Sequence, residues 1–111
     1  MEIIDSGKQK SAVIVSIKGR MDAVSAPEFE KRLEEWIDNG ESKFVIDFCD
    51  LDYISSAGLR SILATAKKLK TKDGWIFLAE LKEVVKEVFE ISGFSSIIPI
   101  YDSVEEALSQ T

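Results

Sequence analysis

The sequence contains no histidine, and this absence excludes much of enzyme chemistry. Histidine is the usual general base near neutral pH and the commonest metal ligand of proteins. The single cysteine, Cys49, cannot form an intramolecular disulfide, which fits a reducing compartment. We therefore expect a cytoplasmic protein that is not an enzyme and that holds neither a metal ion nor a cofactor.

Long apolar runs and an excess of positive charge are also missing. No apolar run is long enough to span a bilayer, and the N-terminus lacks the basic and apolar regions of a secretory signal. The 20 acidic residues outnumber the 14 basic ones, which gives a net charge of -6. Because binding to nucleic acid depends on clustered Lys and Arg, the expected partner is a protein, and neither a membrane nor a nucleic acid.

The apolar residues that are present follow two periodicities. Alternating apolar residues on both sides of Gly7–Lys10 predict an antiparallel hairpin at the N-terminus. The compact apolar runs Phe44–Phe48 and Trp75–Ala79 predict strands that are buried on both faces of a parallel sheet. A last strand is expected within Ile97–Tyr101, at an edge or at a strand end, because Pro99 cannot donate a hydrogen bond to a ladder.

Apolar residues at helical spacing predict about four helices between and after these strands. They are expected from Ser25 to Asn39, from about Ser56 to Lys70, from Leu81 to Gly93 and from Asp102 to Leu108. Ser25 and Glu28 are expected to form a capping box at the start of the first helix. The pattern predicts an α/β fold in a single domain over residues 1–111: a mostly parallel sheet with an N-terminal antiparallel hairpin.

The loop after the strand Phe44–Phe48 leads into two adjacent serines, Ser55 and Ser56. In parallel sheets, ligands bind beyond the carboxyl ends of the strands, where such loops gather. One of the two serines is expected at the N-cap of the following helix, where free N–H groups favour a hydroxyl oxygen or a phosphate. Small Ala57 and Gly58 would leave the hydroxyl open to an approaching protein. An ordinary capped helix start explains the same residues.

Four segments, in order, resemble the STAS domains, the family of bacterial anti-sigma factor antagonists. They are Lys18–Asp22, Phe44–Phe48, Ile54–Arg60 and Val88–Phe94. In that family a phosphorylated serine precedes a small residue and a Gly-Leu pair, and the resemblance maps it to Ser56. It also maps the acidic residue near that serine to Asp22. Many members carry Asp just before the phosphorylated serine, where this chain has Ser55, so Ser55 is the alternative phosphoacceptor.

The resemblance implies a cycle in which binding partners are exchanged. The unphosphorylated domain would bind an anti-sigma factor that is also a serine kinase. Phosphorylation of Ser56 would end this binding, and a phosphatase would restore it. The resemblance implies that the partner is bound, or the site supported, by Asp22, Ser55, Ala57, Gly58 and Leu59. The expected oligomeric state is a monomer or a weak dimer.

Two other functions are compatible with parts of the sequence. An enzyme could use Ser56 or Cys49 as a nucleophile, but the sequence has no histidine base, no Gly-x-Ser-x-Gly motif and no phosphate-binding Gly-rich loop. A buried, inert thiol is therefore expected at Cys49. The second alternative keeps the STAS fold but makes the chain an accessory subunit of a transport or stress-signalling complex, without a sigma-factor role.

Overall fold

The computed structural model describes residues 1–110 and shows five strands and four α-helices within them. The strands are β1 (Glu2–Gln9), β2 (Ala12–Met21), β3 (Lys43–Ile54), β4 (Trp75–Ala79) and β5 (Ile100–Tyr101). The helices are α1 (Ala26–Asp38), α2 (Ser56–Lys70), α3 (Glu83–Ser92) and α4 (Val104–Ser109), and a short 3-10 helix, η1 (Phe94–Ser96), follows α3. The predicted α/β fold with about four helices is confirmed.

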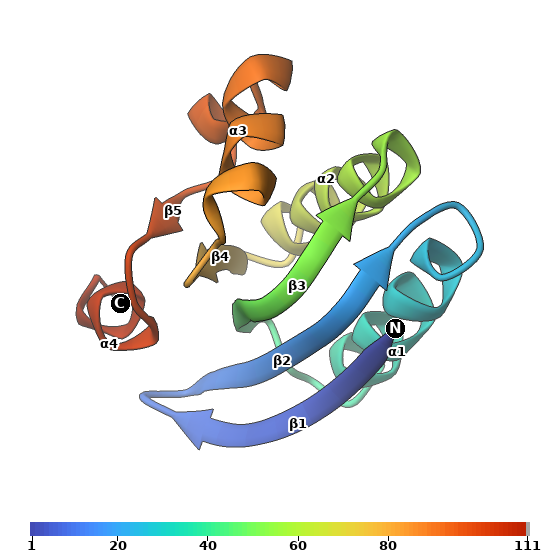
Figure 1. Ribbon diagram of the computed structural model, residues 1–111. Coiled ribbons are helices and arrows are strands. Elements are labelled where there is room, and N and C mark those ends of the chain that lie inside the picture. The colour runs from blue at the N-terminus through green and yellow to red at the C-terminus, as the bar shows by residue number, and fades with distance from the viewer. Residues whose placement is uncertain (111) are drawn as a thin grey trace.

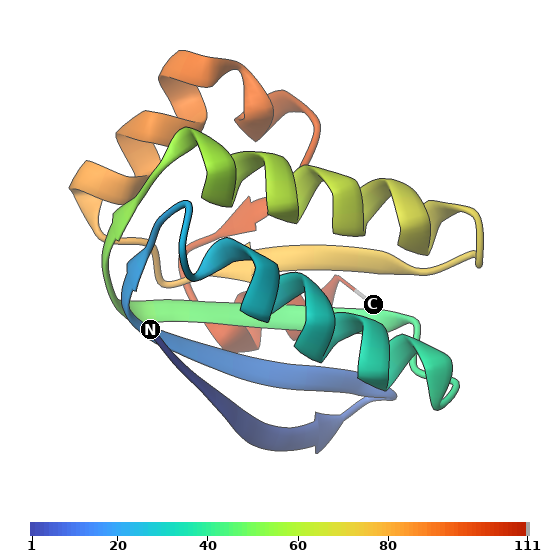
Figure 2. The same cartoon turned by 90° about the vertical axis from the view of Figure 1, so that its right-hand side faces the viewer.

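The strands form one mixed sheet in the order β1-β2-β3-β4-β5 (Figure 1). β1 pairs with β2 antiparallel, and every later neighbour is parallel. The predicted hairpin and parallel remainder are therefore confirmed. Because β2, β3 and β4 run in the same direction, the loops that lead from them into α1, α2 and α3 lie at one end of the sheet (Figure 2).

The two faces of the sheet are covered unequally. Alternate residues of β2 divide between them: Val13 and Val15 pack with α1, α2 and α3 in the larger core, while Ala12 and Ile14 pack with α4 on the other face. Figure 1 shows α4 on the opposite side of the sheet from α1 and α2. Fully buried side chains such as Phe89 each stabilise the fold by about 1.5–3 kcal/mol. The larger core therefore fixes α2, at whose start the two serines lie.

The hairpin turn lies later than the sequence indicated. Lys10 and Ser11 form a two-residue turn in which both φ angles are positive, 50° and 67°, as in a type I′ turn. Gly7 instead lies in an irregularity of the β1–β2 register between Asp5 and Lys8, with a φ of 95°. The prediction of a turn at Gly7–Lys10 was therefore wrong in position, because the glycine serves a bulge and not the turn.

The last strand is also shorter than predicted. Within residues 1–110, only Ile100 and Tyr101 of the predicted segment pair with β4, and η1 ends at Ser96, directly before that segment. Pro99 directly precedes the strand, as expected for a residue without an N–H. β5 lies at an edge of the sheet, so the predicted edge position is confirmed. Helix α4 follows, and the Ser103 hydroxyl caps it by accepting a hydrogen bond from the Glu106 N–H.

Candidate functional site

The two adjacent serines have different positions at the junction of β3 and α2. Ser55 is the N-cap residue of α2, and its Oγ accepts a hydrogen bond of 3.2 Å from the backbone N–H of Gly58. Ser56 is the first residue of the helix, and its side chain is exposed. The hydroxyl of Ser55 is thus engaged in capping, whereas that of Ser56 faces solvent.

The first turn of α2 has unused hydrogen-bond donors beside Ser56. The first N–H groups of a helix have no partner within the helix, and Ser55 accepts from Gly58 only. The N–H groups of Ser56 and Ala57 are therefore available to an anion at this helix end. Arg60 is exposed and lies four residues after Ser56, on the same face of α2. The arrangement can accommodate a phosphate on Ser56.

Gly58 lets α2 approach β2 closely. A Cβ at this position would lie 2.8 Å from Cγ1 of Ile54, 3.0 Å from Cγ of Met21 and 3.1 Å from the Met21 carbonyl oxygen. The same carbonyl accepts a 2.9 Å hydrogen bond from the backbone N–H of Ser55. The start of α2 is thus held directly against the end of β2. Gly58 and Leu59 are buried, so little of their surface is open to a partner.

Asp22 caps the first turn that leads into α1. Its Oδ1 accepts hydrogen bonds from the backbone N–H groups of Val24 and Ser25, and the Ser25 Oγ accepts from the Asp22 N–H. These reciprocal bonds form a capping box three residues before the predicted one. Ser25 makes no cap bond as an N-cap, so the predicted pair of Ser25 and Glu28 was wrong.

The hydrogen bonds of Asp22 within residues 1–110 stay in its own loop, and none reaches Ser55 or Ser56. Above all the hydrogen bond from the Ser25 backbone N–H keeps the pKa of Asp22 below its ordinary value. The carboxylate is therefore ionised at neutral pH. Asp22 is linked to the serines through its neighbour Met21, whose carbonyl receives the Ser55 N–H.

Further exposed side chains lie on the same end of the sheet. Val24 is 90% exposed and Tyr53 is 40% exposed. The guanidinium of Arg20 lies 4.1 Å from the centre of the Tyr53 ring. Asp52 forms an ion pair with Lys82 at the start of α3, and this hydrogen bond raises the pKa of Lys82. This end of the sheet thus exposes a mixture of apolar and charged groups, as at many protein interfaces.

Some of these residues were not identified from the sequence. Arg60 could have been found by its spacing of four from Ser56. An apolar residue in a loop, such as Val24, gives no sequence signal that separates a core position from a surface one. The pairing of Arg20 with Tyr53 depends on the register of β2 against β3, in which these two residues are partners.

Cys49 is exposed, and the prediction of a buried thiol was wrong. The residue lies in the middle of β3, where its N–H donates to the Asp47 carboxylate. Desolvation, together with the negative charges of Asp47 and Asp50, raises the pKa of the thiol to about 11. The fraction of reactive thiolate at neutral pH is therefore very small.

The sequence predicted neither a metal site nor a membrane-spanning segment, and both can be examined in residues 1–110. Over that range no group of three or more His, Cys, Asp or Glu side chains could hold a metal ion. None of the helices within the same range is long and apolar enough to cross a membrane.

Comparison with known proteins identifies relatives over most of the chain. Residues 4–107 match the sequence model of the STAS domain family. BtrV of Bordetella bronchiseptica, named as a candidate anti-sigma factor antagonist, is 46% identical over 95 residues, which cover 86% of this chain and 82% of BtrV. The anti-sigma-B factor antagonist of Bacillus subtilis is 30% identical over 97 residues, covering 87% of this chain and 88% of that protein.

A solved structure shares the arrangement of strands and helices. The Bacillus cell fate determinant SpoIIAA, in its phosphorylated form, matches with a TM-score of 0.74 and 18% sequence identity, over 98% of each chain. At this level of identity, the match supports a common fold and nothing more.

Proposed function

The chain belongs to the STAS domain family, and from this premise we propose that it is an anti-sigma factor antagonist controlled by phosphorylation of Ser56. Unphosphorylated, it binds an anti-sigma factor that is also a serine kinase; phosphorylated, it does not, and a phosphatase restores binding. The names of its relatives describe regulators that act by binding and not enzymes. The cycle takes place in the cytoplasm, with the chain as a monomer or a weak dimer.

The observation that supports this proposal is that Ser56 is exposed whereas Ser55 caps the helix. A kinase must reach the hydroxyl that it phosphorylates. Ser56 is exposed, while Ser55 is half-buried and its oxygen accepts from the Gly58 N–H. Phosphorylation of Ser55 would place a bulky group where the cap hydrogen bond now lies. Ser56 is therefore the phosphoacceptor.

A phosphate on Ser56 changes the surface more than the fold. It adds a charge of about -1.5 to -2 at neutral pH. The free N–H groups at the start of α2, the helix dipole and the guanidinium of Arg60 stabilise this charge within the domain. Exposed apolar side chains such as Val24, in the loop after β2, and Tyr53, near the end of β3, lie at the same end of the sheet. Burying a dianion against a partner without a matching cation is costly, so binding is lost while the domain stays folded.

Asp22 and Gly58 act in this proposal by positioning the phosphoacceptor. Asp22 holds the loop after β2 through its capping box. The carbonyl of Met21 in the same strand end receives the Ser55 N–H, and Gly58 allows the close approach that this bond requires. Ala57 is small and half-buried, so its side chain does not block access to the Ser56 hydroxyl.

The test begins with affinity capture from the source cells, followed by mapping of phosphosites by mass spectrometry. Wild-type protein and the variants Ser56→Asp, Ser56→Ala and Ser55→Asp serve as baits. We expect the wild type and Ser56→Ala to capture a serine kinase and Ser56→Asp to lose it. Ser55→Asp is the matched control, because Asp is an equally good N-cap and adds the same charge one residue away.

Calorimetry with the purified kinase then measures the size of the effect. We expect Ser56→Asp to weaken binding by about 30-fold or more, since a buried uncompensated charge costs about 2–5 kcal/mol. An unchanged affinity of Ser56→Asp would refute the switch, and a phosphate mapped to Ser55 would refute the choice of phosphoacceptor. Capture of transport proteins in place of a kinase would favour the accessory-subunit role.

A further inference from the structure

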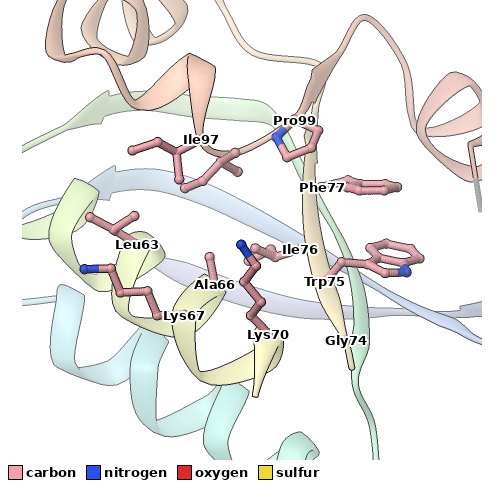
Figure 3. Close-up of a pocket in the computed structure, with 11 residues that line it drawn as sticks. Leu63, Ala66, Lys67, Lys70, Gly74, Trp75, Ile76, Phe77, Ile97 and Pro99 are labelled. Atoms are coloured by element: carbon pink, nitrogen blue, oxygen red, sulfur yellow. The ribbon is translucent and has the colours of Figure 1, made fainter. Parts of the chain in front are cut away.

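A cavity of about 320 Å³ lies between the second half of α2, the first half of β4 and the connection from η1 to β5. Its apolar lining comes from Leu63, Ala66, Ile76, Ile97, Ile98 and Pro99. Figure 3 shows Leu63 and Ala66 facing Ile97 and Pro99 across it. The volume is at the lower end of the range of about 300–1000 Å³ typical of small-molecule sites. Ser56 lies at the other end of α2, so this cavity is separate from the proposed switch.

The cavity exists because the ladder between β4 and β5 starts late. The backbone N–H of Leu78 donates to Pro99, and that of Glu80 donates to Tyr101. Alternate residues of a strand direct their backbone N–H and C=O groups to the same side, so the groups of Ile76 point toward β5, as those of Leu78 do. Pro99 has no N–H to offer there, and the pairing of β4 with β5 begins only at Leu78. Ile76 therefore presents a backbone N–H donor toward the cavity.

Two lysines at the rim form no ion pair with the acidic side chains of residues 1–110. Lys67 and Lys70 line the cavity and lie three residues apart, on the same face of α2. Figure 3 shows the Lys70 side chain extending between Ala66 and Ile76. Four ion pairs occur within residues 1–110, and neither lysine takes part in them. Lys68, between the two, instead pairs with Glu34 at 3.4 Å.

Lys67 and Lys70 thus place two positive charges beside an apolar cavity in a chain whose net charge is -6. We propose that this cavity binds a small amphipathic carboxylate, with its apolar body between Ala66, Ile76 and Ile97 and its anionic group at Lys67 and Lys70. The volume has room for about ten water-sized groups, which fits a medium-chain or aromatic acid. Ile97, now 59% exposed, would be covered by the ligand. This inference does not depend on the proposed function.

The test is a titration of the ¹⁵N-labelled full chain with sodium decanoate, followed by amide chemical shifts. We expect saturable shifts confined to the lining, above all at Ile76 and Ile97, with the amide of Ser56 unchanged. The double variant Lys67→Gln/Lys70→Gln should weaken binding about tenfold or more, because hydrogen bonds to charged groups are lost. Lys72→Gln is the matched control: Lys72 is an exposed lysine outside the cavity, and its removal should leave the affinity unchanged.

A second variant tests the shape of the cavity. Ala66→Leu fills the space between α2 and β4 and should abolish decanoate binding, while circular dichroism confirms that the domain remains folded. Equal binding of decanol and decanoate, or equal loss in Lys72→Gln, would overturn the role of the two lysines. Shifts spread over the whole surface, or none, would overturn the site. Self-association through the open edge of β4, seen as slower diffusion at high protein concentration, would assign the cavity to a second copy.

Discussion

The two serines should separate cleanly in a stability experiment. Replacing Ser55 by Ala removes the acceptor of the Gly58 N–H, and loss of a serine N-cap costs about 0.5–2 kcal/mol. The hydrogen bond of 3.2 Å is long, which favours a small effect, but Gly58 is buried and its orphaned N–H would lack water. We therefore expect Ser55→Ala to lower the free energy of unfolding by about 1–2 kcal/mol.

Ser56→Ala is the matched comparison, because it deletes the same hydroxyl one residue later. Ser56 is exposed and its side chain makes no cap bond, so the change should stay within about 0.5 kcal/mol. Since both variants exchange Ser for Ala, differences in the denatured state nearly cancel. Urea unfolding followed by circular dichroism measures both values, and each kcal/mol should also shift Tm by roughly 4–8 °C.

A cost for Ser56→Ala as large as that for Ser55→Ala would refute this assignment of the cap. So would a Ser55→Ala variant as stable as the wild type. Ser55→Asp provides a positive control, because Asp accepts the same bond and should retain the stability. The same reasoning explains how Ser can occupy the position where many STAS domains have Asp, since both residues are good N-caps.

Three further results are expected. Gly58→Ala should cost about 1–3 kcal/mol in urea unfolding, because its Cβ meets Met21, and unchanged stability would contradict the close approach. In an NMR titration, the carboxyl of Asp22 should have a pKa below its ordinary value; its contribution to stability is then complete above the unfolded-state pKa and is lost as pH falls through the folded-state pKa, a loss that Asp22→Asn should abolish. Cys49 should react slowly with iodoacetamide at pH 8 in spite of its exposure, and faster as pH approaches about 11; rapid reaction at pH 8 would contradict the raised pKa.

The order of strands and helices followed from periodicity because the main elements are strongly apolar on one or both faces. The helix Ser56–Lys70 has the predicted bounds. The details that differed depend on backbone geometry. Lys10 and Ser11 form the hairpin turn with positive φ angles that neither residue type favours, so the sequence could not identify them. The turn was predicted to begin at Gly7 because glycine is common in turns, but the positive φ of Gly7 belongs to the bulge in β1.

The candidate site was predicted from the sequence, but the hydrogen bonds of its residues were not. The sequence left the N-cap of α2 open between Ser55 and Ser56, and the hydrogen bond from the Gly58 N–H assigns it to Ser55. Asp22 was expected near the serines; its neighbour Met21 accepts the Ser55 N–H, while the Asp22 carboxylate caps the turn before α1, since a capping box can start with Asp as well as with Ser. These two N-cap assignments differ by one residue and by three residues, and the apolar periodicity of a helix does not fix its first residue that closely.

The bulge in β1 has a consequence for how the protein behaves at high concentration. β1 is the outer strand of the sheet, and such strands can recruit a strand from another copy and so start aggregation. Here the row of backbone donors is interrupted: Gly7 has a φ of 95°, and its N–H donates to the Asp5 carboxylate. An incoming strand would meet a gap in the ladder at this point. A local defect in the sheet thus protects the chain from fibril-like polymerisation along its longest open edge.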